Sequence, residues 1–447
     1  MSLRLTVIGT GYLGATHAVC MAELGHEVLG VDVDPEKIAA LRAGRVPFYE
    51  PELAGLLAKH TASGRLRFTT SYEEAADFGQ VHFSCVGTPQ RPGSDAADLR
   101  YVDAVVEALG PHLRKPALVV GKSTVPVGTA DRLARRLAEL APAGAAAELA
   151  WNPEFLREGF AVRDTLRPDR LVLGVRSAAA ESLLREVYAP VIAAGTPVIT
   201  ADFATAELVK TAANAFLATK ISFINAMAEL CEAADADVSV LARAIGHDER
   251  IGARFLRAGV GFGGGCLPKD IRAFAARAEE LGTGRSLAFL REVDAINTRR
   301  RERAVDLARE LCGGSLQGKR VGVLGAAFKP DSDDIRDSPA LDIAARIHLD
   351  GADVTVHDPK AMDNARKSHP QLGHALSAAD AVRDADVVLH LTEWSEYRDL
   401  DPARLRPLAR HARILDGRGA LDAARWTAAG WSFHALGRAT GTPGNTL

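Results

Sequence analysis

The N-terminal segment up to Asp32 constrains the fold of this chain more than any other part of the sequence. Residues 3–8 (LRLTVI) predict a buried strand, and the turn Gly9–Gly14 (GTGYLG) follows directly. Residues 15–24 carry the small side chains of a packed helix, and a second apolar strand over 26–31 ends in Asp32. In this order the glycines admit a pyrophosphate to a helix N-terminus. The segment therefore predicts a Rossmann-type unit that binds a nicotinamide or flavin dinucleotide.

The cofactor expected at this turn is NAD. The Asp32 carboxylate can accept hydrogen bonds from ribose hydroxyls, and it would repel the additional phosphate of NADP. Lys37 lies close enough in sequence to cover the adenosine, although an ordinary surface lysine would give the same pattern. The fingerprint places these residues at the cofactor: Gly9, Gly11, Tyr12, Leu13, Gly14, Asp32 and Lys37.

The second strong signal is the segment 261–270 (GFGGGCLPKD), in which a run of glycines leads into a single cysteine. Glycines let a backbone approach a ligand closely and turn its N–H groups towards an anion. Pro268 suits the first turn of a helix, so Cys266 would lie at a helix N-terminus beside Lys269, and both neighbours favour the thiolate. Asp270 would share a helix face with Cys266 and could act as a base. The pattern favours a reactive nucleophile over a buried structural cysteine.

The order of apolar segments predicts α/β units at both ends of the chain. Strands alternate with helices in the N-terminal part, which indicates a mostly parallel, doubly wound sheet. The further strands expected there cover residues 81–86, 117–120, 149–151 and 170–175. A second Rossmann-like unit, with no full GxGxxG turn, is expected after Gly313, Gly314 and Gly318. Its expected strands cover 319–324, 353–357, 385–391 and 413–416, with a helix over 338–349.

A long helix is expected between these two units. The segment 202–234 contains no Gly or Pro, Asp202 can cap its start, and apolar residues lie on several of its faces. Such a helix suits a domain linker, a dimer interface or both. The large apolar residues Leu208, Phe216, Phe223 and Leu230 form one stripe. We therefore expect domains over 1–200, 201–312 and 313–447, and a homodimer built on the central helix.

Composition narrows the classes of partner and compartment. With 447 residues the chain is long enough for about three domains. Its formal net charge of -3 gives no reason to expect nucleic acid or an anionic membrane as a partner. The five scattered cysteines indicate a reducing compartment rather than a disulfide framework or a metal site. The N-terminus enters a strand without a signal peptide, so a cytoplasmic location is expected.

Taken together, these segments resemble the UDP-glucose/GDP-mannose dehydrogenase family over almost the whole chain. The stretches that carry the resemblance are 9–14, 86–89 (VGTP), 122–129 (KSTVPVGT), 152–159 (NPEFLREG), 210–214 (KTAAN), 261–270 and 328–339 (FKPDSDDIRDSP). Two positions depart from the family pattern. Glu52 stands where members often carry Gly, and Gly419 stands where many carry Asn after Arg418.

The resemblance implies an NAD-dependent, four-electron oxidation of a nucleoside-diphosphate hexose at its C6 alcohol, with UDP-glucose to UDP-glucuronate as the expected reaction. Two hydride transfers and one water are needed. Cys266 would trap the intermediate aldehyde as a thiohemiacetal, and the second hydride would leave a thioester for hydrolysis. The C-terminal domain would bind the nucleotide sugar.

The resemblance also implies roles for individual residues. Lys210 and Asn214 would face the same way from one helix and hold the oxyanion, while Asp270 and Thr124 would activate water, with Glu154 as a further carboxylate. It adds Thr88, Thr124 and Glu158 to the cofactor site. The substrate would be bound by Glu154, Phe155, Leu156, Lys210, Asn214, Arg250, Phe262, Gly263, Lys329 and Arg336. For Arg250, a surface salt bridge fits equally well.

Three alternatives stay open at this point. The same reaction could use dTDP-glucose, GDP-mannose or UDP-N-acetylmannosamine, because a pocket for one nucleobase or sugar cannot be distinguished from the sequence. A dehydrogenase of the 6-phosphogluconate or 3-hydroxyacid type needs no cysteine nucleophile, so Cys266 argues against it. A catalytically inactive regulator that binds nucleotide sugars would not need Cys266, Lys210 and Asp270 together.

Overall fold

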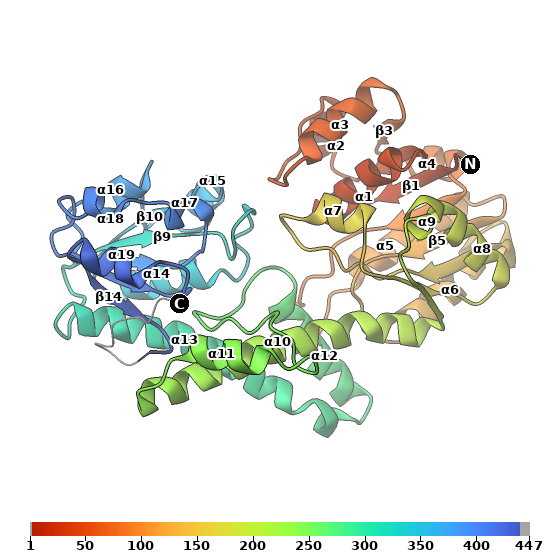
Figure 1. The fold of residues 1–447 in the computed structure, drawn as a ribbon. Helices are drawn as coiled ribbons and strands as arrows, with labels where there is room; N and C mark the ends of the chain where they lie inside the picture. The colour runs from red at the N-terminus through yellow and green to blue at the C-terminus, as the bar shows by residue number, and fades with distance from the viewer. Residues whose placement is uncertain (1, 439–447) are drawn as a thin grey trace. The chain divides into compact units, whose positions relative to one another are not determined.

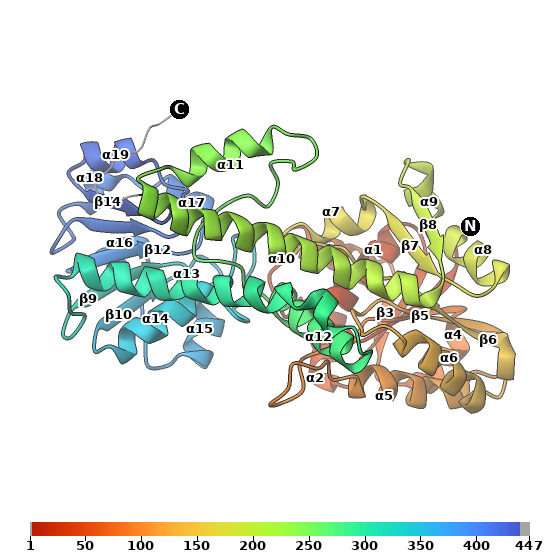
Figure 2. The ribbon, with the colours of Figure 1, turned by 90° about the horizontal axis from the view of Figure 1, so that it is seen from below.

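The computed structural model describes residues 2–438 and divides into two compact units, which we describe separately. The first unit comprises Met1–Ala213 together with Ala276–Gly284, and the second comprises Asn214–Ala275 together with Arg285–Leu447. Figure 1 colours the chain along its length, and Figure 2 gives a second view. None of the helices between residues 2 and 438 has the length and apolar character that crossing a bilayer requires.

The first unit is built on an eight-stranded sheet. Its strands lie in the order β3 (Leu66–Thr69), β2 (Glu27–Val31), β1 (Arg4–Ile8), β4 (Val81–Ser84), β5 (Ala117–Gly121), β6 (Ala147–Trp151), β7 (Leu171–Gly174) and β8 (Val198–Ala201). Every neighbouring pair is parallel except β6 and β7, which meet in an antiparallel bridge between Trp151 and Gly174. The predicted doubly wound sheet is confirmed. Because strand order reverses beside β1, the loops after β1 and β4 border the crevice where such sheets bind ligands.

Helices cover both faces of this sheet. They are α1 (Tyr12–Glu23), α2 (Pro35–Arg42), α3 (Leu53–Ala62), α4 (Tyr72–Phe78), α5 (Arg100–Leu109), α6 (Thr129–Leu140), α7 (Ala161–Leu166), α8 (Ala178–Val187) and α9 (Ala189–Ala193). Successive strand residues point to opposite faces, so Leu118 and Val120 join one core with α1 while Val119 joins another with α5 and α6. Helix α1 begins inside the glycine motif, at Tyr12 rather than at residue 15, because the turn itself winds into the first helical residues.

The predicted long helix is α10 (Phe203–Ala234), of 32 residues, whose first turn is capped by Asp202 accepting from Thr205 N at 2.7 Å. The other helices of this region are α11 (Val238–Gly246), α12 (Leu267–Glu280) and α13 (Phe289–Leu311). Figure 2 shows α13 alongside the C-terminal part of α10. Phe262 belongs to residues 261–265 (GFGGG), which we call the glycine-rich loop. It packs in one core cluster with Ala218 of α10, Ile271 of α12 and Val293 of α13, and this contact anchors the loop to the helices.

One side of α10 leaves large apolar side chains in contact with solvent. Phe216, Phe223 and Leu230 are 67%, 49% and 60% exposed, and Leu208 is also exposed. Their spacing of seven or eight residues keeps them on one helix face. Within residues 2–438, the stripe expected from the sequence is therefore left exposed rather than covered by a core.

The second unit carries a six-stranded, all-parallel sheet. Its strands lie in the order β11 (Gly373–His374), β10 (Asp353–His357), β9 (Arg320–Leu324), β12 (Val387–His390), β13 (Arg413–Asp416) and β14 (Ser432–Ala435). The helices are α14 (Pro339–Leu349), α15 (Met362–Ser368), α16 (Ala378–Val382), α17 (Ser395–Arg398), α18 (Pro402–Leu405) and α19 (Ala423–Ala428). The second Rossmann-like unit is thus confirmed.

The turn after β9 differs from the turn after β1. Residues 325–338 separate β9 from α14, and the Asp358 carboxylate at the end of β10 accepts hydrogen bonds from Ala326 N and Ala327 N at 2.8 and 2.9 Å. Trp394 donates to the same oxygen at 3.1 Å. The long loop is therefore fixed by the chain itself, and it is available to carry side chains towards the glycine-rich loop.

Asp416 organises the carboxyl end of β13. One carboxylate oxygen accepts from His390 Nδ1 at 2.8 Å and from Arg418 N at 3.0 Å, and the other accepts from Ala420 N and Leu421 N, both at 2.8 Å. Burial alone would raise the pKa of Asp416, but the bonds from His390 and from the backbone outweigh it and lower the pKa.

Replacing Asp416 with Asn should destabilise this unit by about 2–4 kcal/mol, because the amide has one acceptor oxygen and would leave buried donors unpaired. The native pKa lies below the unfolded value, so the stabilisation is present above about pH 4 and is lost as pH falls through the native pKa. Melting temperatures of the two proteins should therefore converge below about pH 4. A gap that stays constant on acidification would contradict this assignment.

Candidate active site

The three motif glycines occupy different environments in the turn after β1. Gly9 has φ +86° and a side chain there would lie 2.7 Å from Val86 Cγ1, while a Cβ on Gly14 would lie 1.7 Å from Gly9 O. A Cβ on Gly11 would meet nothing within 4 Å. Helix α1 begins just after Gly11 with no side-chain cap and no acidic residue in its first turn. The turn is thus closed on the protein side and open on the side where a pyrophosphate would lie, so the residues fit a dinucleotide.

Asp32 lies at the end of β2 beside this turn. One carboxylate oxygen accepts from Thr10 N at 2.8 Å and Lys37 Nζ at 2.9 Å, and the other accepts from Asp34 N at 3.1 Å. Burial would raise the pKa of Asp32, but the bonds from Lys37 and the backbone N–H groups lower it overall. The carboxylate is therefore held ionised next to the glycine turn. The structure pairs Lys37 with Asp32, and the expected role of Lys37 at the adenosine stays a prediction.

A buried carboxylate missed by the sequence analysis, Glu50, supports the same end of the sheet. The Tyr12 hydroxyl donates to Glu50, and Glu50 also accepts from Gly159 N and Ala161 N, both at 2.7 Å. Burial and the Glu50 charge raise the pKa of Tyr12. The segment that carries the buried Glu158 is thereby tied to the start of α1. An acidic residue between Tyr49 and Pro51 was the only local signal for this role. Leu13 packs against the core that α1 forms with Leu118 and Val120.

The carboxyl ends of β4, β5 and β6 gather the next set of expected residues. Thr88 Oγ1 donates to Thr124 O at 2.8 Å, which joins the loops after β4 and β5. Glu154 follows β6, and one of its oxygens accepts from Phe155 N and Leu156 N at 2.8 and 3.0 Å. These residues lie together because parallel strands end at one edge of a sheet.

Lys122 is a further residue of this edge whose role the sequence did not reveal. Its buried ammonium lies 3.1 Å from Glu154 Oε2 and donates to Asn152 Oδ1 at 3.0 Å. Burial alone would lower the pKa of Lys122, but the Glu154 charge and its neighbours raise it. Glu154 thus faces a permanent positive charge. A lysine placed directly after an apolar strand is the sequence signal that could have indicated it.

Lys210 belongs to the same unit and lies on α10. Its ammonium is 5.3 Å from the centre of the Phe155 ring, so the structure brings Lys210 next to the segment that holds Glu154. The side chain is only partly buried.

In the second unit, Cys266 immediately precedes α12 and is exposed. Pro268 occupies the first turn, as the sequence predicts, and Asp270 N donates to Cys266 O at 3.0 Å. The Asp270 carboxylate is buried; it accepts from Asn214 Nδ2 at 2.7 Å and pairs with Lys269 at 2.5 Å. The contact between Asn214 and Asp270 was not expected. It fixes both side chains one helical turn below the thiol.

The glycine-rich loop packs against the loop after β9. Gly264 N donates to Arg336 O at 2.9 Å, and a Cβ on Gly264 would lie 2.7 Å from the Phe328 ring. A Cβ on Gly265 would lie 2.3 Å from Arg336 Cζ, and Lys329 Nζ is 5.2 Å from the Phe328 ring centre. Arg336 therefore lies against Gly265, the residue before Cys266, and Lys329 lies beside Phe328. Two cationic side chains at this position suit a diphosphate.

Two arginines outside this group behave differently from each other. Arg250 is exposed and pairs with Asp248 at 2.6 Å. This is the surface salt bridge that the sequence analysis gave as the alternative to substrate binding. Its expected role at the substrate stays a prediction. Arg418 donates to Gly261 O at 2.9 Å and to Phe328 O at 3.1 Å, so it joins the glycine-rich loop to the β9 loop.

The geometry at Asp32 predicts the cofactor preference. The wild type should prefer NAD, and Asp32→Ser should lower the ratio of kcat/KM for NAD over NADP by at least about tenfold, because a repelling charge is lost beside Lys37. Asp34→Ser is the matched control, since Asp34 caps α2 from an exposed position. Steady-state kinetics with both cofactors provide the measurement. A wild type that prefers NADP would contradict the assignment.

Comparison with known proteins agrees with this geometry. Three models of the UDP-glucose/GDP-mannose dehydrogenase family match: the NAD binding domain over residues 3–192, the central domain over 204–299 and the UDP binding domain over 322–423.

Several relatives match over nearly the whole chain. A UDP-glucose 6-dehydrogenase of Rhizobium meliloti is 41% identical over 98% of this chain and 100% of its own length, and TuaD of Bacillus subtilis, also named UDP-glucose 6-dehydrogenase, is 40% identical over 97% and 93%. The structure of a UDP-glucose dehydrogenase from Pyrobaculum islandicum matches with a TM-score of 0.90 and 40% identity, covering 98% of each chain. The chain therefore belongs to the UDP-glucose/GDP-mannose dehydrogenase family.

Proposed function

We propose that this protein is an NAD-dependent UDP-glucose 6-dehydrogenase that oxidises the C6 alcohol of the sugar to a carboxylate. The observation that carries the proposal is the exposed Cys266 at the start of α12, behind a glycine-rich loop that packs against Arg336. The open Gly11 turn in the same chain supports a dinucleotide-dependent reaction. Relatives at 40–41% identity that are named UDP-glucose 6-dehydrogenase support UDP-glucose over the other sugar nucleotides.

In the proposed reaction, Cys266 forms the covalent intermediate. NAD held by the Gly9–Gly14 turn and Asp32 would supply the acceptor for each hydride. The Cys266 thiolate adds to the aldehyde carbon formed by the first oxidation, which gives a thiohemiacetal. Loss of a hydride from that carbon leaves a thioester. Water then breaks the C–S bond, and the products are the carboxylate and the free thiol.

The other residues stabilise charge and move protons. We assign Lys210 and Asn214 to the oxygen that becomes negative in the thiohemiacetal step. Asp270, Thr124 and Glu154 are assigned to the hydrolytic water, and the ion pair of Lys122 with Glu154 orients that carboxylate. Lys329 and Arg336 are assigned to the diphosphate. Phe262 and Gly263 would line the sugar, and Arg250 is retained as a weaker candidate for the substrate site.

Product stoichiometry tests the proposed reaction. UDP-glucose, dTDP-glucose, GDP-mannose and UDP-N-acetylmannosamine are supplied in parallel with NAD, and NADH and free aldehyde are measured. UDP-glucose should give the highest kcat/KM and two NADH per sugar, without released aldehyde. One NADH per sugar together with accumulated aldehyde would reject the covalent route. Faster turnover of another sugar nucleotide would reject the proposed substrate.

Cys266→Ser should lower kcat by at least about 1,000-fold, because serine provides no comparable anion at neutral pH. The dissociation constants for NAD and UDP-glucose, measured by calorimetry, should stay close to those of the wild type. Cys312→Ser is the matched control in the same unit, since Cys312 is buried in the core that includes the strands of the six-stranded sheet. Near-normal turnover by Cys266→Ser would show that Cys266 is structural.

We further propose that the protein is a homodimer in the cytoplasm. The exposed apolar stripe of α10 supports self-association, because contiguous apolar faces of this kind mark interaction sites. The five cysteines scattered along the sequence support a reducing compartment.

The double variant Phe216→Glu/Phe223→Glu should sediment as a monomer at micromolar concentration, whereas the wild type should sediment as a dimer. Glutamate places charges where apolar side chains would be buried between subunits. Leu349→Glu is the control, because Leu349 is 83% exposed at the end of α14. A wild type that sediments as an active monomer would contradict the proposal.

A further inference from the structure

We propose that Asn297 and Arg301, one turn apart on α13, are positioning residues that set the geometry of Cys266 by holding the backbone at Phe262. The inference rests on the proposed role of Cys266 as the nucleophile. Neither side chain needs to touch the substrate. They are 2% and 8% exposed, and both act on the glycine-rich loop from the side of α13.

Asn297 holds Phe262 by two hydrogen bonds. Its Oδ1 accepts from Phe262 N at 2.7 Å, and its Nδ2 donates to Phe262 O at 2.9 Å. The fit requires the preceding glycine, because a Cβ on Gly261 would lie 2.2 Å from Asn297 Oδ1 and the backbone there has φ +87°. The side-chain amide thus supplies hydrogen bonds to backbone groups that have no strand or helix partner in this irregular loop.

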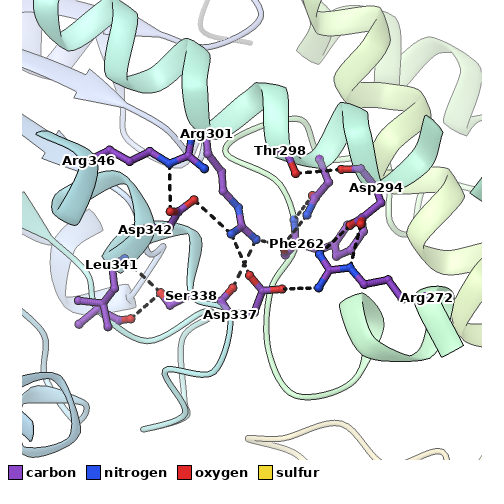
Figure 3. Close-up of polar contacts among 12 residues, drawn as sticks. Phe262, Arg272, Asp294, Thr298, Arg301, Asp337, Ser338, Leu341, Asp342 and Arg346 are labelled. Carbon is purple, nitrogen blue, oxygen red and sulfur yellow. Dashed lines mark hydrogen bonds and ion pairs between the residues drawn. The ribbon is translucent and has the colours of Figure 1, made fainter. Parts of the chain in front are cut away.

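Arg301 binds the same carbonyl and a second segment. Its Nη2 donates to Phe262 O at 3.1 Å, and its Nη1 donates to Asp337 Oδ1 at 2.8 Å and Asp342 Oδ2 at 3.3 Å. Figure 3 shows the guanidinium of Arg301 between Phe262 on one side and Asp337 and Asp342 on the other. A planar guanidinium can serve both sides at once, whereas an ammonium provides a single point of charge.

Asp342 extends the network to α14, and Asp337 extends it to α12, the helix that follows Cys266. Asp342 accepts from Arg346 Nε at 3.0 Å, and Asp337 lies 4.0 Å from Arg272 of α12. Arg272 in turn forms a bidentate pair with Asp294 of α13 at 2.8 and 3.0 Å, as Figure 3 shows. Cys266 lies between two fixed points, the Phe262 backbone before it and α12 after it.

The opposite side of the loop is closed by the segment that carries Asp337. A Cβ on Gly263 would lie 2.2 Å from Asp337 O. The loop therefore cannot move towards this segment, and Asn297 and Arg301 prevent it from moving away from α13. Because only residues 263–265 separate Phe262 from Cys266, a shift of the Phe262 backbone displaces the sulfur. A misplacement of about 1 Å at a reacting atom can cost about 100-fold in rate.

The network is better explained by positioning than by stability alone. A buried charged group gives little net stability, because desolvation offsets most of the attraction to its partners. Hydrogen bonds made inside a buried polar network do fix one backbone conformation, as those of Asn297 and Arg301 to the Phe262 backbone do, although Arg301 Nε has no hydrogen-bond partner among residues 2–438. The nucleophile of this reaction must approach one carbon atom in two successive steps, so one fixed conformation is what it requires.

The test compares Asn297→Ala and Arg301→Met with the wild type in the full-length protein. Arg299→Met is the matched control, since Arg299 lies on the same helix and pairs with Glu292 at the surface. The measurements are kcat and KM for UDP-glucose per titrated thiol, the alkylation rate of Cys266 by iodoacetamide, backbone hydrogen exchange of residues 261–266, and the melting temperature.

We call Asn297 and Arg301 the clamp, because together they hold the Phe262 backbone. For both clamp variants, Asn297→Ala and Arg301→Met, we expect kcat to fall about 10- to 100-fold while KM changes less than about threefold. Backbone hydrogen exchange of residues 261–266 should become faster. The alkylation rate of Cys266 should change by at least about threefold, because the thiol leaves its fixed environment. Arg299→Met should behave like the wild type in all four measurements.

Arg301→Met/Asp337→Asn separates positioning from stability. The second substitution removes the carboxylate that has lost its nearest cationic partner, so the melting temperature should recover while kcat stays low. Recovery of kcat together with the melting temperature would overturn the proposal, as would wild-type exchange and wild-type kcat in both single variants. If Arg301→Met or Asn297→Ala does not fold, Arg301→Lys and Asn297→Ser replace them, with the same measurements and the same expected results.

The exchange and alkylation measurements need no substrate, so they report on the clamp independently of the proposed reaction. If the wild type oxidised no nucleotide sugar, the proposed function would fail, while altered exchange and alkylation in the variants would still support the clamp. Unaltered exchange and alkylation with reduced kcat would show that the two residues act by another route, and the clamp would be rejected.

Discussion

The candidate active site depends on backbone approaches that only glycine permits. A Cβ would lie 2.2 Å from Asn297 at Gly261, 2.2 Å from Asp337 O at Gly263 and 2.3 Å from Arg336 at Gly265. Any side chain at these positions would force the loop away from α13 or from the loop after β9. The cysteine is therefore presented by a segment that is rigid because it is tightly packed, although its sequence resembles that of a flexible linker.

The two sheets use the same device for different purposes. In each, a carboxylate at the end of the second strand accepts backbone hydrogen bonds from the turn after the first: Asp32 from Thr10, and Asp358 from Ala326 and Ala327. After β1 the chain enters a helix at once, which leaves an open, uncapped N-terminus beside Gly11. After β9 a long loop intervenes and carries Phe328, Lys329 and Arg336 to the glycine-rich loop. A shared architecture thus serves a dinucleotide in one unit and positions cationic side chains in the other.

Buried charges determine how the expected residues are oriented. Lys122 faces Glu154, Arg301 faces Asp337 and Asp342, and Lys269 faces Asp270. Each pair is costly to desolvate, so its main effect is to orient the side chains rather than to stabilise the fold. The residues that meet the substrate in the proposed reaction are thereby supported by neighbours that do not.

The sequence by itself determined the local features. Glycine spacing and apolar runs located the turn after β1, both sheets, the long helix α10 and the position of Cys266 before α12, because backbone conformation and period-two or helical patterning are encoded within short segments. The short strands β3, β8, β11 and β14 and the antiparallel bridge of β7 were not anticipated, since brief or partly exposed strands lack such a pattern. Only the tertiary structure decided which polar groups pair: Asn214 with Asp270, Lys122 with Asn152, and Asn297 with Phe262 join residues 56, 30 and 35 positions apart. Those pairings follow from helix packing and strand order, in which side chains distant in sequence become neighbours, and no local pattern records them.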